Sequence, residues 1–274
     1  MESLQVKVRS LTMHLKRFNS GAEEKLVLLH GFTGSTSTWD NVIKYLPSTI
    51  EVLTIDLIGH GETFSPDDFA RYYVEEQIED LHELFIQQDW TDFTLAGYSM
   101  GGRLALAYAE KYPVKRLILE SSSPGLAEVE ERAKRKIADE LLANKITEEG
   151  IVSFIDYWEE IPLFESQKSL SFEKREMIRA ERLAQSEIGL ANSLRGFSTG
   201  VQFSYWDKLE QMNSSSVLIV GELDEKFCRI ADLMKKQLPN ARLVKVKGVG
   251  HAIHVENPEI FATIIEEAIL EEDY

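Results

Sequence analysis

One serine of the chain lies in a five-residue pattern that is typical of enzymes with a reactive serine. The segment Gly97–Gly101 reads G-Y-S-M-G and places Ser99 at the centre of a G-x-S-x-G motif. An apolar run of strand type, Phe93–Ala96, precedes the motif, and a helical run rich in small residues, Gly102–Ala109, follows it. A strand, this turn and a helix in that order form a nucleophile elbow, which holds the serine on a sharp turn above the sheet edge. Ser99 is therefore the candidate nucleophile or base.

Two later residues supply the partners that a reactive serine needs. A serine hydroxyl is weak at neutral pH, so a histidine must accept its proton and a carboxylate must hold that histidine. Asp224 follows the apolar run Val217–Val220, and His251 follows the run Leu243–Val246. Both runs are expected to be strands of the same sheet. We therefore expect their ends to bring Asp224 and His251 beside Ser99.

Several neighbouring polar residues are alternatives or have structural interpretations. Glu222 and Glu225 flank Asp224 and compete with it for the role of the acid. Other conspicuous residues are expected to support the structure rather than the chemistry, and these are His30, His60, His254 and Cys228.

Two backbone amides are expected to stabilise a developing oxyanion. One belongs to Met100, the residue directly after Ser99. The other belongs to Phe32, in the loop that follows the apolar run Leu26–Leu29. A preorganised amide of this kind contributes about 3 kcal/mol to transition-state stabilisation.

Apolar runs of strand type alternate with segments of helical periodicity along most of the chain. The first two runs, Leu4–Val8 and Leu11–Arg17, predict a hairpin. Residues 124–200 favour helices throughout and interrupt the alternation. These patterns predict an α/β fold with a mostly parallel sheet flanked by helices and an inserted helical cap. We assign residues 1–123 and 201–274 to the core and 124–200 to the cap. In such a sheet, the residues that follow the parallel strands meet at one edge.

The composition excludes several classes of partner. The 274 residues carry a formal net charge of -16 and a pI of about 4.9, which disfavours nucleic acid and anionic membrane surfaces. The N-terminal segment is too charged for a signal peptide, and no apolar stretch approaches the roughly 20 residues of a membrane span. With a single cysteine, these features favour a cytoplasmic protein without membrane insertion. We expect no metal, no cofactor, and a monomer or weak homo-oligomer.

The motifs together resemble those of the α/β-hydrolase superfamily. In that resemblance the last acidic position of the turn Gly221–Asp224 belongs to the triad, which favours Asp224 over its neighbours. The matching positions are His30-Gly31, Asp56-x-x-Gly59-His60-Gly61, the turn around Ser99, Asp224 and His251.

Within this superfamily the whole chain is similar to the 2-succinyl-6-hydroxy-2,4-cyclohexadiene-1-carboxylate (SHCHC) synthases of menaquinone biosynthesis. The resemblance implies a lyase that eliminates pyruvate from 2-succinyl-5-enolpyruvyl-6-hydroxy-3-cyclohexene-1-carboxylate. Ser99, activated by His251 and Asp224, would then remove a ring proton without forming an acyl-enzyme. The segments that carry this closer match are Gly97–Arg103, Glu120–Leu126, Glu131–Asp139, Gly221–Phe227 and Gly250–Pro258.

The implied substrate carries three carboxylates, so the pocket must hold cations within an acidic protein. Arginine suits this task because its planar fork binds carboxylates with two hydrogen bonds. The alternatives are an ion pair with a neighbouring acid for Arg103, a solvated basic face for Arg135 and plain cap core for Trp158. By motif, the residues expected to bind this polycarboxylate are Arg103, Arg135, Arg182, Tyr98, Trp158 and Lys226.

Three other functions fit the same motifs. A serine carboxylesterase or thioesterase would share the fold and the triad, but a neutral substrate would not require converging arginines. A carbon–carbon bond hydrolase also accepts anionic substrates, and analysis of its products would distinguish it from a lyase. A non-enzymatic small-molecule sensor of this fold would bind its ligand with slow turnover.

Overall fold

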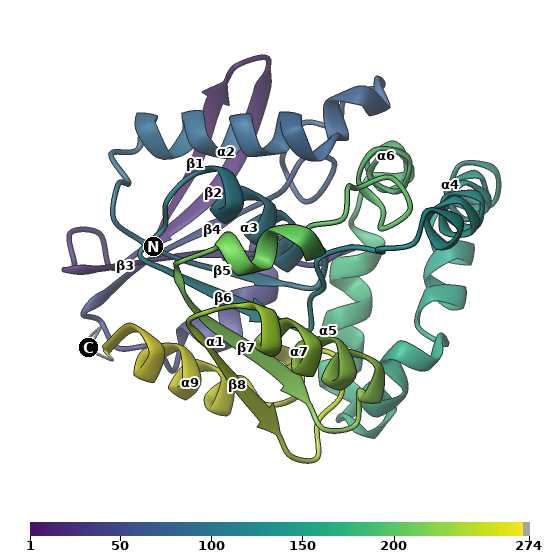
Figure 1. Ribbon diagram of the computed structural model, residues 1–274. Coiled ribbons are helices and arrows are strands. Elements are labelled where there is room, and N and C mark those ends of the chain that lie inside the picture. Colours follow the sequence, from purple (N-terminus) through teal and green to yellow (C-terminus); the bar gives the residue numbers. More distant parts are fainter. Residues whose placement is uncertain (271–274) are drawn as a thin grey trace.

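Eight strands form one sheet in the order β1-β2-β4-β3-β5-β6-β7-β8 in the computed structural model, which describes residues 1–270 (Figure 1). The first two strands form an antiparallel hairpin, β2 also pairs antiparallel with β4, and the other neighbouring pairs are parallel. The predicted hairpin and the mostly parallel sheet are confirmed. The strands are β1 (Glu2–Val8), β2 (Leu11–Phe18), β3 (Glu24–Leu29), β4 (Ile50–Ile55), β5 (Thr94–Tyr98), β6 (Arg116–Glu120), β7 (Ser215–Gly221) and β8 (Ala241–Val246).

Apolar side chains of the central strands face two separate cores, because successive residues of a strand point to opposite faces. In β3, Leu26 and Leu28 belong to one core, whereas Val27 and Leu29 belong to the other. This burial on both faces explains the continuous apolar runs of the sequence. The first core is covered by α1 (Asp40–Ile43) and α9 (Pro258–Leu270), and the second by α2 (Val74–Gln87), α3 (Met100–Lys111) and α7 (Glu225–Gln237).

The chain between β6 and β7 forms a helical region that packs beside one end of the sheet (Figure 1). Among its described residues it contains no strand, so the predicted α/β fold with an inserted helical cap is confirmed. The cap has a small apolar core of its own, built mainly by α4 and α6. Gly150, with φ of 84°, breaks α4 into two arms. The cap elements are α4 (Val129–Trp158), η3 (Pro162–Ser169), α5 (Phe172–Leu183) and α6 (Glu187–Phe197), and η4 (Trp206–Gln211) follows them and packs on the core before β7.

Specific contacts fix the cap on the core. Glu181 of α5 accepts hydrogen bonds from the hydroxyls of Ser35 (2.6 Å) and Thr38 (2.7 Å), which lie at the 3-10 helix η1 (Thr36–Trp39) that follows β3. On α6, a Cβ at Gly189 would lie only 2.1 Å from the carbonyl oxygen of Gly59, so the backbones approach too closely for a side chain. The cap therefore covers the loops that follow the strands. Within residues 1–270, no helix is long and apolar enough to cross a membrane.

Candidate active site

The turn between β5 and α3 holds Ser99 in a conformation that only a constrained backbone maintains. Ser99 has φ of 49° and ψ of -103°, outside the regions that most residues adopt. A Cβ at Gly97 would lie 2.4 Å from the carbonyl oxygen of Gly101, and one at Gly101 would lie 2.3 Å from that of Leu29. Both glycines are therefore required for the sharp turn, as the motif predicts.

The structure brings Ser99, His251 and Asp224 together in one hydrogen-bonded chain. The Nε2 atom of His251 lies 3.1 Å from the Ser99 hydroxyl, and its Nδ1 atom lies 2.6 Å from Oδ2 of Asp224. His251 is buried, with 1% of its surface exposed. A carboxylate can only accept, so the imidazole carries its proton on Nδ1 and presents Nε2 to the serine as an acceptor. This arrangement can draw a proton from the serine hydroxyl.

The geometry also distinguishes Asp224 from its two acidic neighbours. Asp224 caps the N-terminus of α7, where its Oδ1 accepts a hydrogen bond from the Phe227 amide at 3.1 Å. Glu222 instead accepts from the Gly248 amide, and Glu225 pairs with Arg229 in an exposed position. Of the three carboxylates, Asp224 alone contacts His251 in the described structure.

The two residues whose amides are expected to form an oxyanion hole line one cavity with Ser99. Met100 is the first residue of α3, so its amide has no carbonyl partner within the helix. Phe32 lines the same cavity as Ser99 and Met100. The loop of Phe32 is held by His30, whose Nδ1 lies 2.7 Å from the Gly31 carbonyl and whose Nε2 accepts from the Leu57 amide at 3.0 Å.

Two buried histidines beside this loop are neutral. Burial lowers the pKa of His30, although the nearby Asp56 carboxylate opposes the shift. Burial lowers the pKa of His60 to about 3, and the neighbouring His30 adds to this effect. The two rings lie 5.1 Å apart, so neither readily gains a charge next to the other. Neither lines the Ser99 cavity, and their role as structural residues stays a prediction.

The Ser99 cavity has a volume of about 560 Å³ and is bordered by both core and cap. Its walls are mostly apolar, with Trp158 and Phe164 from the cap and Phe227 from the core. The Lys, Arg, Asp and Glu side chains that line it are four cations and one acid: Arg103, Arg135, Lys226, Arg229 and Glu131. A protein with a formal net charge of -16 thus builds a locally positive cavity around its serine.

Arg103 is the most buried of these cations and forms no ion pair with a carboxylate of the described residues. Its guanidinium donates to the side-chain oxygen of Gln202 and, at 2.9 Å, to the carbonyl of Phe197. It also lies over the Phe197 ring, 4.4 Å from the centroid. Burial, together with the charge of the nearby Arg135, lowers the pKa of Arg103. The predicted alternative, an ion pair with a neighbouring acid, is therefore wrong.

Arg135 of α4 lines the Ser99 cavity. Its Nε donates to both oxygens of Asp139, at 2.7 and 2.8 Å, which leaves the two terminal nitrogens of the fork for another acceptor. Its neighbour Arg132 instead donates to the backbone carbonyls of Leu126 and Ala127. Arg135 thus lines the cavity, although 43% of its side chain is exposed.

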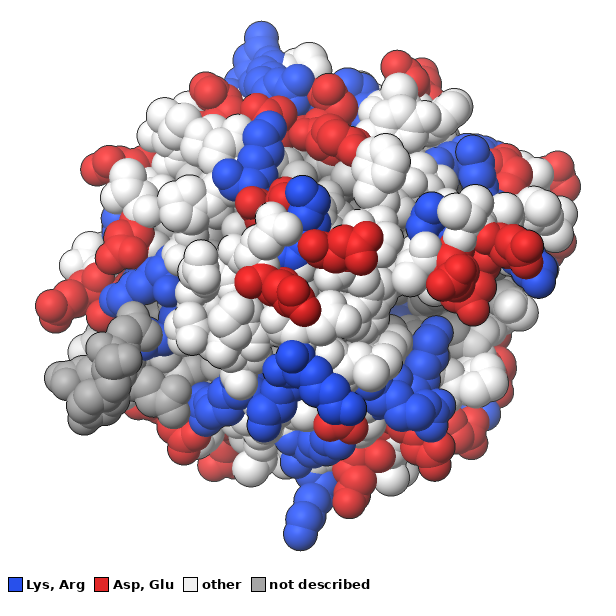
Figure 2. All heavy atoms as spheres, viewed as in Figure 1, with Lys and Arg blue, Asp and Glu red and all other residues white. Residues whose placement is uncertain are grey.

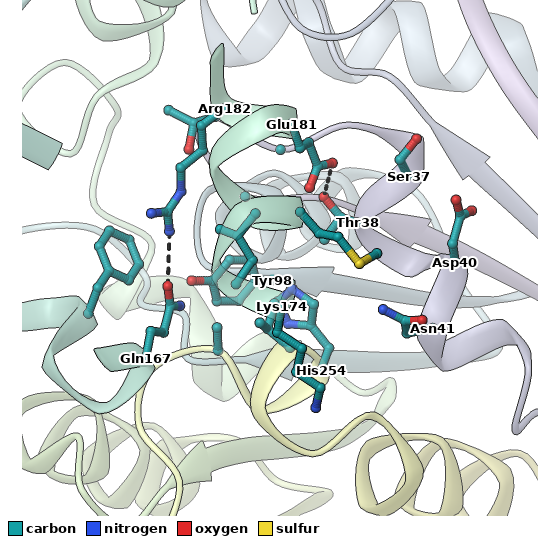
Figure 3. A pocket seen from close by; sticks show the side chains of 18 of the residues that line it. Ser37, Thr38, Asp40, Asn41, Tyr98, Gln167, Lys174, Glu181, Arg182 and His254 are labelled. Carbon is teal, nitrogen blue, oxygen red and sulfur yellow. Dashed lines mark hydrogen bonds between the residues drawn. The ribbon is translucent and has the colours of Figure 1, made fainter. Parts of the chain in front are cut away.

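Arg182 lies in a different place from the other two arginines. It borders a second cavity of about 180 Å³ (Figure 3), which shares Phe32, Tyr98 and Phe164 with the first. Its guanidinium donates to Gln167 at 3.1 Å, lies 3.4 Å from a Glu159 oxygen and covers the Phe164 ring. Burial lowers the pKa of Arg182. The structure does not bring Arg182 to the wall of the Ser99 cavity, and its role in substrate binding stays a prediction.

Trp158 and Lys226 both line the Ser99 cavity. Trp158 also packs edge-on against Phe32, with ring centroids 5.4 Å apart, so it joins the cap core to the expected oxyanion loop. Sequence reasoning missed Arg229, which lines the same cavity. The signal was its spacing, because a residue three positions after Lys226 on α7 shares the same helix face.

Positive side chains also continue away from the cavity along α7. Figure 2 shows Lys and Arg gathered over the lower part of this face, where α7 lies in Figure 1. Besides the two that line the cavity, α7 carries Lys235 and Lys236 in its last turn. An anion approaching this side of the molecule therefore meets a local field opposite in sign to the overall charge.

The chain is similar to several known proteins. The model of the family described as "Alpha/beta hydrolase family" matches residues 26–264. A Bacillus subtilis (strain 168) protein, provisionally named a 2-succinyl-6-hydroxy-2,4-cyclohexadiene-1-carboxylate synthase, is 45% identical over 248 residues, which are 90% of each chain. The synthase of that name from Salmonella typhimurium is 31% identical over 237 residues, covering 85% of this chain and 88% of its own.

A solved structure of MenH from S. aureus is similar over almost the whole fold. It superposes with a TM-score of 0.89 and 36% sequence identity, covering 93% of this chain and 97% of its own. The similarity therefore includes the helical cap as well as the sheet.

Proposed function

Because the chain belongs to the α/β hydrolase family, and within it to the SHCHC synthases, we propose that it forms SHCHC by eliminating pyruvate from 2-succinyl-5-enolpyruvyl-6-hydroxy-3-cyclohexene-1-carboxylate. This reaction is a step of menaquinone biosynthesis. Ser99, His251 and Asp224 are the catalytic residues, and they act as a base.

The observation that carries the proposal is the buried Arg103 in the cavity of Ser99. A buried cation without a carboxylate partner is costly, and a carboxylate of the substrate would provide the missing partner. Arg135 lines the same cavity and binds Asp139 only through Nε, so its terminal nitrogens suit a second carboxylate. An enzyme for neutral esters gains nothing from such a pair of cations.

The reaction proceeds by removal of one proton and departure of one group. His251 accepts the Ser99 hydroxyl proton while Ser99 Oγ takes the proton from ring carbon 2, next to the succinyl ketone. The electron pair of that C–H bond forms the double bond between carbons 2 and 3, and the ring double bond moves to carbons 4 and 5. The bond from carbon 5 to oxygen breaks, and the enolate of pyruvate leaves with that electron pair. A proton returned to this enolate gives pyruvate, so no water is consumed.

The remaining residues lower the barrier by holding charge in place. As carbon 2 loses its proton, negative charge develops on the ketone oxygen, which the amides of Phe32 and Met100 stabilise. The cations hold the carboxylates and so orient the C–H bond toward Ser99. Trp158, Lys226 and Arg229 complete the wall around the ring.

The proposal is tested by supplying the enolpyruvyl substrate and measuring pyruvate with lactate dehydrogenase and NADH. A p-nitrophenyl ester serves as the control for hydrolysis. We expect fast pyruvate release from the first substrate and little turnover of the second. Efficient ester turnover without pyruvate release would contradict the lyase and support a carboxylesterase.

A further inference from the structure

We propose that Glu120 and His254 form a positioning pair, which fixes the segment of Ser99 relative to the segment of His251. The proposal rests on the proposed function only in taking Ser99 and His251 as the reacting pair. Neither Glu120 nor His254 lines the Ser99 cavity, so the pair acts through its neighbours.

The main-chain carbonyl of Glu120 holds Ser99 in place. It is the last residue of β6 and lies opposite Tyr98, the last residue of β5. Its carbonyl oxygen accepts a hydrogen bond from the Ser99 amide at 2.8 Å, and the next residue but one, Ser122, donates its hydroxyl to the Ser99 carbonyl at 3.2 Å. A residue in a rare backbone conformation persists only where its surroundings hold it, and these two bonds do so for Ser99.

The side chain of the same Glu120 holds the segment that carries the histidine. Its Oε1 accepts from the backbone amide of His254 at 3.0 Å, and its two oxygens lie 2.9 and 2.8 Å from the His254 Nδ1. His254 lies in the short helix α8 (Ile253–Glu256), three residues after His251. Glu120 therefore contacts Ser99 by its main-chain carbonyl and the segment of His251 by its carboxylate.

Tyr98 transmits the position of this pair to the triad. Its ring centroid lies 4.5 Å from that of His254 and 5.3 Å from that of His251, so one ring packs against both imidazoles. Figure 3 shows Tyr98 and His254 side by side at the second cavity. On its other side His254 packs against Trp39, at 4.8 Å between centroids. A shift of His254 would therefore displace the ring that supports His251.

Burial of the polar side chains of Glu120 and His254 is costly, which indicates that this pair does more than fill space in the core. Glu120 and His254 are each only 1% exposed, and burial of a carboxylate is unfavourable unless it is fully hydrogen-bonded. An apolar pair would fill the same space but could not bind a backbone amide and a ring nitrogen in fixed directions. Directional bonds are what the alignment of Ser99 with His251 requires.

The experiment compares Glu120→Gln with His14→Asn as the matched control. His14 belongs to another buried histidine–carboxylate pair, with Asp56 at 2.7 Å, but it lies on β2, three strands away from β5. Two readouts are used: the rate at which a fluorophosphonate labels Ser99, which needs no substrate, and kcat and KM for pyruvate release. Circular dichroism and thermal melting establish that each variant is folded.

We expect Glu120→Gln to lower both the labelling rate and kcat by roughly 10- to 100-fold, because a small misplacement of reacting groups has effects of this size. KM should stay within about twofold, since no substrate contact is removed. His14→Asn should retain both rates. Full labelling and full kcat in folded Glu120→Gln, or an equal loss in the control, would overturn the proposal.

A second pair of variants keeps the test decisive if Glu120→Gln does not fold. His254→Asn retains an amide donor near the position of Nδ1, whereas His254→Leu removes the donor but fills the space. We expect His254→Asn to recover most of the labelling rate that His254→Leu loses, and equal rates in the two would refute positioning by this bond. If the wild-type protein released no pyruvate while Glu120→Gln still slowed labelling, the proposed function would fail and the positioning pair would stand.

Discussion

Replacement of Arg103 by glutamine tests the argument that the cavity binds carboxylates. The side-chain amide of glutamine can still donate to the Phe197 carbonyl or to Gln202, which are the present partners of the guanidinium. The charge, however, is lost from a position that is only 8% exposed. Arg103→Gln therefore separates the role in folding from the role in binding.

The expected loss follows from the burial of the site. Removal of one partner of a buried, hydrogen-bonded charge pair costs about 2 to 5 kcal/mol, because the other charge is left unpaired. At about 1.4 kcal/mol per factor of ten, kcat/KM should fall roughly 30- to 5,000-fold. The free energy of unfolding should change by only about 1 kcal/mol, since loss of a desolvated charge offsets loss of hydrogen bonds.

The assay is pyruvate release coupled to lactate dehydrogenase, with Arg195→Gln as the control. Arg195 lies on α6 and pairs with Glu140 at 3.0 Å, but it does not line the Ser99 cavity. This exposed pair contributes at most about 1 kcal/mol, so the control should keep its kcat/KM. If Arg103→Gln retained kcat/KM within about threefold of the wild type, the reasoning from the unpaired buried cation would be refuted.

Three further predictions concern the base, the acid stability and the surface charge. Ser99→Ala should abolish measurable pyruvate release while leaving the melting temperature close to that of the wild type, and normal release would exclude Ser99 as the base. Since burial lowers the pKa of His60 from 6.5 to about 3, the unfolded chain binds the extra proton, and stability is lost as the pH falls through this range. His60→Asn should flatten the slope of the unfolding free energy there by up to about 1.4 kcal/mol per pH unit in urea titrations, and an unchanged slope would contradict a neutral His60. Charge reversal by Lys235→Glu with Lys236→Glu should lower kcat/KM several-fold at low salt and hardly at high salt, whereas Lys44→Glu, outside both α7 and the cavity, should not.

The sheet and the relative positions of the triad were predictable from local patterns. Apolar runs identify strands buried on both faces, and polar residues directly after parallel strands must meet at one edge. Ser99, Asp224 and His251 each follow such a run, so their proximity needed no knowledge of the cap. The helical character of the cap was likewise evident from its composition and periodicity.

The arrangement of the cap could not be read in the same way. Its helices show polar and apolar faces, but their rotation over the sheet depends on tertiary contacts such as Glu181 with Ser35 and Gly189 with Gly59. The sequence therefore could not show that Arg135 would line the Ser99 cavity whereas Arg182 would line the second one.

Glu120 is a residue whose role could not be predicted from the sequence, for a different reason. An acidic residue at the end of a strand is ordinarily read as a solvated position. The bonds from its carboxylate run to His254, a residue 134 positions later in the chain. Only the structure shows that this carboxylate is buried and bonded to the segment of His251, while the main-chain carbonyl of the same residue holds Ser99.

The central claim is that the triad removes a proton and adds no water. It is tested most directly by the mass of the ring product formed from the enolpyruvyl substrate. We predict one pyruvate per turnover together with a conjugated diene carboxylate. A ring product heavier by one water, with a hydroxyl retained at carbon 5, would show hydrolysis and contradict the account.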